Sequence, residues 1–191
     1  MIRVFQRKFE DYGYILDYMA HGKMVGTRPA FKTEPLVQIL GESYFTLLEA
    51  TPRSDVTISI HERVYIGKEL PREKISHISS RVIYNELSST AKVELPPVVE
   101  EIVMKNEERF VRFFNNAQPI THRMHSLELV PGIGKKYTWT ILDTREKKPF
   151  ESFEDIKSRI GLPEPSKLIT KRIIEELCEV EPKYKLFTRI P

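Results

Sequence analysis

Short runs of apolar and aromatic residues, separated by turn residues, fill the first half of the chain. The runs lie at residues 12–19, 36–40, 44–50, 56–60, 63–66 and 75–84. Residues 56–60 alternate strictly between apolar and polar positions, which is typical of a half-buried strand. Short strands at regular spacing are typical of a small barrel or sandwich. We therefore predict a β-domain over residues 1–92 and favour a β-barrel of the OB type.

In the second half, the apolar positions recur with helical spacing instead. The predicted helices span residues 85–92, 97–115, 121–130, 134–145, 152–161 and 167–179. Pro96 and Pro97 favour a helix start, because proline lacks a backbone donor that the first helical turn does not need. Residues of the type that caps helices precede or open two of the others, at Thr121 and Ser152.

These two patterns together predict an α+β fold with two domains and a tail. The all-α domain covers residues 93–180. The tail covers residues 181–191 and contains an alternating stretch at 184–190. That stretch either adds a strand to the barrel or stays mobile.

A glycine-rich turn joins two of the predicted helices. Residues 131–136 read Pro-Gly-Ile-Gly-Lys-Lys. Gly132 and Gly134 allow a tight turn and a close approach of the backbone to another molecule, since glycine has no Cβ. The amides that open the next helix have no partner inside it and carry the positive end of its dipole. With Lys135 and Lys136 beside them, they predict a site for an anion such as a phosphate.

This turn resembles the hairpin of helix-hairpin-helix motifs, with which members of that superfamily grip nucleic-acid phosphates. The resemblance rests on the Pro-Gly-Ile-Gly run, on Thr138 in the place of a small residue, and on the aliphatic pair at 141–142. It implies a nucleic-acid-binding set of Gly132, Ile133, Gly134, Lys135, Lys136 and Thr138. Residues 161–166 resemble a second, degenerate hairpin of a tandem pair. Its turn departs from the pattern with one glycine and two prolines, so its contribution would come through the charge of Lys167, Lys171 and Arg172.

An OB-type barrel presents aromatic and basic side chains to single-stranded nucleic acid. Candidates on the predicted strands are Tyr12, Tyr14, Tyr44, Phe45, Arg63, Tyr65 and Lys68. The preferred surface set among them is Tyr44, Arg63, Tyr65 and Lys68. A strand has two faces, so some of these aromatic side chains point into the core and others away from it. The sequence leaves open which ones do so.

Composition narrows the range of functions. The net charge is only +3, so a nucleic-acid footprint has to be local. The single cysteine, Cys178, excludes an internal disulfide framework and favours a reducing compartment. Its apolar helical surroundings predict that it is buried. The sequence contains no apolar run that could span a bilayer and no signal-peptide pattern, which predicts a cytoplasmic protein without a membrane partner.

Patterns for catalysis and for cofactors are absent from the sequence. A Walker A loop around Gly134 would need a glycine where Leu129 stands and a Ser or Thr where Lys136 stands. One cysteine does not supply a zinc site, and His122 and His125, predicted on one helical face, have no third ligand nearby. We therefore predict no catalytic residue, no metal and no cofactor.

Over nearly its full length, the chain resembles an archaeal family known as domain of unknown function 655. The resemblance is carried by residues 34–36, 41–49, 62–67, 109–115, 119–121, the hairpin and 148–153. It implies an N-terminal β-domain followed by hairpin motifs, and a role in RNA binding associated with translation or rRNA. The resulting hypothesis is a non-catalytic nucleic-acid-binding protein, with RNA favoured over DNA. The alternative, favoured by the near-neutral charge, is an interaction module that docks a ribosomal or RNA-processing protein.

Overall fold

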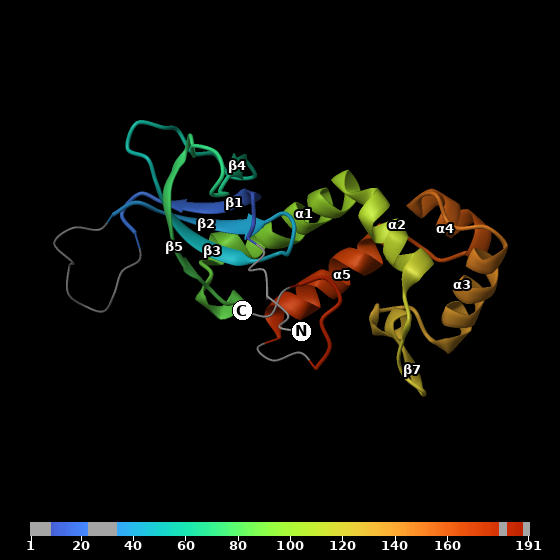
Figure 1. Ribbon diagram of the computed structural model, residues 1–191. Helices are drawn as coiled ribbons and strands as arrows, with labels where there is room; N and C mark the ends of the chain where they lie inside the picture. The colour runs from blue at the N-terminus through green and yellow to red at the C-terminus, as the bar shows by residue number, and fades with distance from the viewer. Residues whose placement is uncertain (1–8, 23–33, 180–182, 189–191) are drawn as a thin grey trace, which may run out of the picture. The chain divides into compact units, whose positions relative to one another are not determined.

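The computed structural model describes residues 9–22, 34–179 and 183–188 (Figure 1). The chain divides into two compact units, one formed by Met1–Val98 with Phe187–Pro191 and the other by Val99–Leu186. We call them the β-unit and the helical unit. The first holds a sheet of five strands and the second holds most of the helices, so the predicted α+β class is confirmed.

The sheet of the β-unit is antiparallel and curled. Its strands are β1 (Tyr12–Met19), β2 (Leu36–Gly41), β3 (Leu47–Pro52), β4 (Arg63–Tyr65) and β5 (Ile75–Arg81). Their order is β4-β1-β2-β3-β5, so β4 and β5 are edges and the sheet forms a half-barrel with an open side (Figure 1). A bulge in β1 between Ile15 and Asp17 adds to the curl, because the extra residue bends the strand.

The centre of β1 is buried on both of its faces. Ile15 joins an aliphatic core with Val37, Ile39, Leu48, Ala50, Val64, Ile66 and Ile75. Tyr14 points to the other face and is only 1% exposed, as is Phe45 in the loop before β3. Both aromatic side chains are therefore core residues, which answers for these two the question that the sequence left open.

Residues 56–60 do not form the predicted strand. Val56 and Ile58 are half-buried, and Ile58 packs against the core, so the alternating pattern does reflect burial. The segment pairs with none of the five strands of the sheet, however. Alternating burial orients side chains, whereas strand formation also requires a neighbouring strand to pair with.

Helix α1 (Ser89–Lys105) begins well before the predicted start. Ser88 caps it, since its Oγ accepts a hydrogen bond from the backbone N–H of Ala91 at 3.0 Å. Pro96 and Pro97 therefore lie inside the helix, where each lacks the N–H that would bond to the carbonyl four residues earlier. The predicted short helix at 85–92 is divided between the 3-10 turn η1 (Tyr84–Glu86) and this first turn of α1.

The helical unit continues with short elements and four further helices. They are α2 (Glu107–Asn116), β6 (Pro119–Thr121), β7 (Met124–His125), the 3-10 turn η2 (Ser126–Leu129), α3 (Lys135–Lys147), α4 (Phe153–Ile160) and α5 (Pro165–Cys178). Helix α4 packs against both α3 and α5. Ser152 caps α4 as predicted, accepting from the Asp155 N–H at 3.0 Å. None of the described helices is long and apolar enough to cross a membrane.

The predicted helix at 121–130 is replaced by the β6–β7 hairpin and η2. The Thr121 hydroxyl accepts from the Arg123 N–H at 3.2 Å, which closes a turn instead of capping a helix. His125 takes the capping role, because its Nδ1 accepts from the Leu127 N–H at 3.1 Å. His122 and His125 consequently do not share a helical face.

Two expectations at the C-terminal end were also tested. Cys178 is exposed, so the prediction of a buried thiol was wrong. Residues 183–188 of the tail form bends and no strand. Residues 189–191 lie outside the described residues.

Candidate nucleic-acid interface

The Pro-Gly-Ile-Gly turn has a backbone conformation that depends on glycine. Gly132 has a φ of 89°, in the left-handed region that side chains disfavour. Ile133 is 3% exposed, and its N–H donates to the Val130 carbonyl at 3.0 Å. The buried side chain and the bonded amide fix the loop, so that residues 134–136 are held at the surface.

Helix α3 begins at this surface with its N-terminal amides uncovered. The N-cap is Gly134, with φ −90° and ψ −176°, and no side chain caps the helix. A Cβ added to Gly134 would meet nothing within 4 Å, so the space in front of the helix is open. The first turn contains no acidic residue, and both Lys135 and Lys136 are exposed. The structure thus brings together the main predicted site residues in an arrangement that attracts an anion.

The turn between α4 and α5, predicted as a degenerate second hairpin, has a different charge arrangement. The N-cap of α5 is Glu164, whose carboxylate lies 3.3 Å from the Lys167 Nζ and 3.5 Å from the Lys157 Nζ. Hydrogen bonding and attraction by Lys167, and then by Lys157, lower the pKa of Glu164. An ionised carboxylate therefore lies beside Lys167 and pairs with the cation whose charge was expected to contribute at this turn.

Arg172 is engaged within the helical unit. Its Nε donates to the Glu176 Oε1 at 2.9 Å, and its Nη2 donates to the Tyr184 carbonyl at 2.6 Å. The Arg172 side chain is 11% exposed and that of Glu176 is 0% exposed. The guanidinium thus compensates a buried carboxylate and ties residue 184 to α5. Lys171 remains exposed on α5.

A groove of about 500 Å³ lies between the β6–β7 hairpin and α3. Its lining includes Arg123, His125, Lys135, Thr138, Trp139 and Leu142, and we call it the Trp139 groove. Trp139 is 67% exposed, whereas Thr138 is 4% exposed. Lys135 belongs both to this groove and to the first turn of α3, so the groove borders the uncovered helix N-terminus. Trp139 and Arg123 were missed at the sequence level, because their positions depend on a β-hairpin where a helix was predicted.

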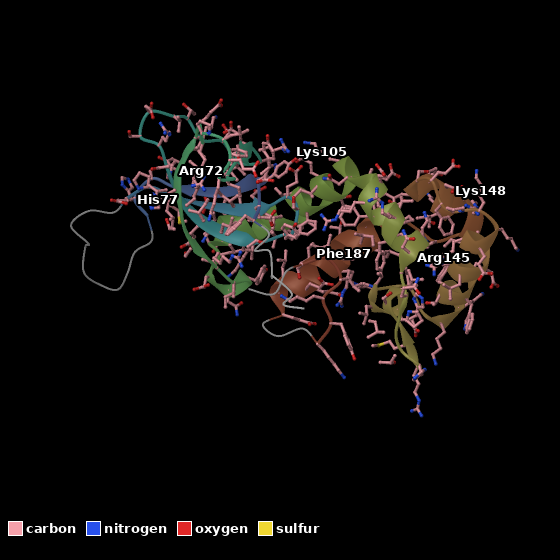
Figure 2. The ribbon with its side chains drawn as sticks, in the orientation of Figure 1. Arg72, His77, Lys105, Arg145, Lys148 and Phe187 are labelled. Atoms are coloured by element: carbon pink, nitrogen blue, oxygen red, sulfur yellow. The ribbon has the colours of Figure 1, made fainter. Side chains whose placement is uncertain are left out.

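His125 should make the stability of the helical unit depend on pH. Burial, and then the nearby Arg145, lower the pKa of His125 below its ordinary value. Arg145 is itself held by the carbonyls of Phe114 and Ala117 at 2.8 and 3.0 Å (Figure 2). The unfolded chain therefore takes up this proton at a higher pH than the folded chain. The stability that the neutral His125 ring contributes is complete above about pH 6.5. It is lost as the pH falls through the lowered pKa of His125 in the folded protein.

We expect urea unfolding to report this loss between neutral pH and about pH 5. The variant His125→Asn keeps an acceptor for the Leu127 N–H but does not titrate, so its stability should fall less over the same range. An equal fall in both proteins would show that another group causes the acid destabilisation.

The predicted surface residues of the β-unit are mostly engaged in local contacts. Arg63 donates from Nε and Nη2 to the Glu42 Oε2, at 3.1 and 2.7 Å, and its guanidinium lies 3.6 Å from the centre of the Tyr12 ring. The Tyr65 hydroxyl accepts two backbone N–H groups of the following loop, at 3.1 and 3.0 Å. Tyr44 is half-buried. These contacts give the Arg63 and Tyr65 side chains structural roles.

Lys68 lies instead in a groove of about 390 Å³ at the open side of the half-barrel. Leu48, Ile66 and Ile78 contribute apolar surface, and cations from the loop after β4 and from β5 line it as well, namely Lys68, Arg72 and Arg81. Figure 2 labels Arg72 together with His77, which also lines this groove. The carboxylate of Glu10 in the groove accepts three backbone N–H groups of residues 43–46, at 2.8–3.1 Å. The cationic groove of the β-unit therefore differs from the predicted surface set in all but Lys68.

Comparisons with known proteins place the chain among archaeal relatives. The family described as "Protein of unknown function (DUF655)" matches residues 9–189. The "Uncharacterized protein MJ0038" of Methanocaldococcus jannaschii is 48% identical over 184 residues, which cover 96% of this chain and 82% of that protein. The crystal structure of Af1531 from Archaeoglobus fulgidus has a TM-score of 0.85 and 48% identity, and the match covers 94% of this chain and all of that one. The family resemblance inferred from the sequence is thereby confirmed.

Proposed function

The chain belongs to the family described as "Protein of unknown function (DUF655)", and within it we propose that this protein binds single-stranded RNA without catalysis. The turn at 131–136 and the N-terminus of α3 hold a backbone phosphate. We interpret η2–α3 and α4–α5 as a tandem helix-hairpin-helix unit with a short first helix, and the half-barrel as an OB-type module. A role associated with translation or rRNA is the expectation that accompanies the family resemblance.

The observation that carries the proposal is the uncovered N-terminus of α3. In the same unit, α2 has Glu107 and Glu108 in its first turn, α4 has a serine cap with two acids, and α5 has Glu164. Helix α3 instead has a glycine N-cap, no acid in its first turn and two exposed lysines. The uncapped amides, the helix dipole and two exposed lysines are all found in the first turn of α3, which favours a phosphate there.

An unpaired strand fits better than a duplex because the grooves are small and partly apolar. The groove of the β-unit combines aliphatic surface with the cations Lys68, Arg72 and Arg81. Proteins that bind single strands use such a combination, with charge along the backbone and apolar or aromatic surface against the bases. RNA is favoured because its sequence-specific recognition takes place mostly on unpaired bases.

Reversing the charge of Lys135 and Lys136 tests the proposal. We expect Lys135→Glu with Lys136→Glu to weaken binding of a single-stranded RNA of about 12 nucleotides at least tenfold at low salt. Each lost phosphate contact should also flatten the salt dependence, by about 0.7 in the slope of log K against log salt. Fluorescence anisotropy over a series of salt concentrations measures both quantities.

The opposite end of the same helix provides the control. Lys147→Glu with Lys148→Glu changes the net charge equally, and Lys148 pairs with a surface acid, Glu151, at 2.8 Å. This control should keep the wild-type salt slope. Equal losses in both double variants would assign the effect to overall charge and would remove the phosphate site from the turn.

The second candidate function is docking of a protein partner, and the net charge of only +3 favours it. Under this hypothesis, partner capture from cell extract would survive nuclease treatment, and the double variant at 135 and 136 would bind RNA like the wild type. Under the RNA hypothesis, nuclease treatment would release whatever is captured together with the RNA.

A further inference from the structure

The Trp139 groove contains a buried polar group that the fold does not use. Thr138 is 4% exposed, and its Oγ1 has no hydrogen-bond partner among the described residues. A buried hydroxyl without a partner is destabilising, so such groups need an explanation. Thr138 lines the groove through its other atoms, because its Oγ1 is covered by the protein and faces away from the open space.

Trp139 gives the groove a large aromatic wall. It is 67% exposed on α3, although tryptophan is highly buried on average in folded proteins. Met124 and Leu142 add apolar surface. A volume of about 500 Å³ lies within the range of pockets that take small ligands. A flat, apolar ring system is the chemistry that these walls match.

The polar groups around the walls match the edge and the charge of a nucleotide. The His125 Nδ1 accepts from a backbone N–H, so the neutral ring carries its proton on Nε2 as a donor. Arg123 and Lys135 contribute cations. Glu128 also lines the groove, and its Oε1 accepts from the His125 N–H at 2.9 Å, which commits that oxygen to the η2 turn.

We propose that the Trp139 groove binds one unpaired nucleobase of the RNA, stacked on Trp139, with the polar edge of the base toward His125 and the cations of the groove. The inference rests on the proposed function, because the phosphate next to this base is the one held at the N-terminus of α3. Lys135 lies in both sites and makes them neighbours. The phosphate contact carries no sequence information, so a base site would allow the protein to distinguish between bases.

The chain contains a single tryptophan, so its fluorescence reports on this groove alone. We expect a base-bearing oligoribonucleotide to quench it and an abasic strand of the same length to leave it unchanged. The base-bearing strand should bind the wild type about 5- to 100-fold more tightly than it binds Trp139→Ala. Trp139→Phe should retain most of the affinity, because every aromatic face supports stacking.

A second variant is the matched control on the same helix. Thr138→Val has nearly the same shape and removes the unpartnered oxygen, so it should unfold at a higher urea concentration than the wild type. Because the covered oxygen does not reach the groove, this variant should bind the base-bearing strand as tightly as the wild type. An equal loss of affinity in Thr138→Val and Trp139→Ala would contradict stacking on Trp139.

The phosphate site and the base site are tested by different measurements. Binding of the abasic strand, compared between the wild type and the double variant at 135 and 136, tests the phosphate site. Equal affinity of the wild type and Trp139→Ala for the base-bearing strand, or the absence of quenching at saturation, would overturn the base site and leave the phosphate site standing.

Discussion

Replacing Gly134 by aspartate is expected to lower the affinity for single-stranded RNA by roughly 10- to 150-fold, which corresponds to the loss of one hydrogen-bonded ionic contact. The same variant should be as stable as the wild type or a few tenths of a kcal/mol more stable. Anisotropy titration and urea unfolding of one preparation measure the two effects. Their opposite directions make the result specific to the proposed site.

The reason lies in the N-cap geometry of α3. Gly134 has extended backbone angles, φ −90° and ψ −176°, which aspartate adopts at N-caps without strain. Its new side chain would meet no atom within 4 Å at the Cβ position. The carboxylate would accept the free amides of the first turn and interact favourably with the helix dipole. It would thus occupy the place of the phosphate and repel the RNA backbone.

The matched control is Gly134→Asn, which has the same shape and caps helices equally well but carries no charge. The asparagine variant should lose less affinity than the aspartate variant, and the difference between them measures the repulsion of the phosphate. If both variants bind RNA as tightly as the wild type, then the N-terminus of α3 does not contact the strand.

The features that could be predicted from the sequence are those determined by neighbours along the chain. Ser152 caps α4 through a bond to a residue three positions later, and the glycine turn at 131–134 leads directly into α3. Such local contacts need no knowledge of the rest of the fold. The main part of the candidate site, residues 132–136, could be predicted from the sequence for the same reason.

The features that could not be predicted depend on tertiary partners or on competition between local signals. Thr121 could either cap a helix or close a turn, and the bond to Arg123 decided for the turn. That choice created the hairpin that forms one wall of the Trp139 groove. Pro96 and Pro97 favoured a helix start, but the cap at Ser88 starts the helix earlier. The periodicity of apolar residues predicts neither the turn at Thr121 nor the start of α1 after Ser88.

Charge was the least predictable property, because a cation in the sequence does not reveal its partner. Lys167 and Arg172 were predicted to contribute through their charge, alongside the phosphate site at Lys135 and Lys136. In the structure, Lys167 lies 3.3 Å from Glu164, and Arg172 is held by Glu176. The two hairpins therefore differ in function under our proposal, with phosphate bound at the first and the second held by internal ion pairs.

Replacing Arg172 by methionine is expected to destabilise the helical unit by about 3–5 kcal/mol. Methionine retains much of the apolar stem but leaves the Glu176 carboxylate, whose side chain is 0% exposed, without its guanidinium partner. The bond that ties the Tyr184 carbonyl to α5 is lost as well. Domains have a total stability of about 5–15 kcal/mol, so urea unfolding should show a large shift of the midpoint.

The control variants separate this structural role from RNA binding. Lys171→Met removes an exposed charge from the neighbouring position and should change stability by less than about 0.5 kcal/mol. The double variant Arg172→Met with Glu176→Met removes both charges of the pair and should recover part of the lost stability, since an apolar pair replaces an ionic one. Recovery stays incomplete because the Tyr184 carbonyl and the Leu186 N–H lose their side-chain partners. Below the unfolding range, Arg172→Met should keep the wild-type salt slope for RNA. A flattened slope with unchanged stability would instead show that Arg172 leaves Glu176 and contacts phosphate.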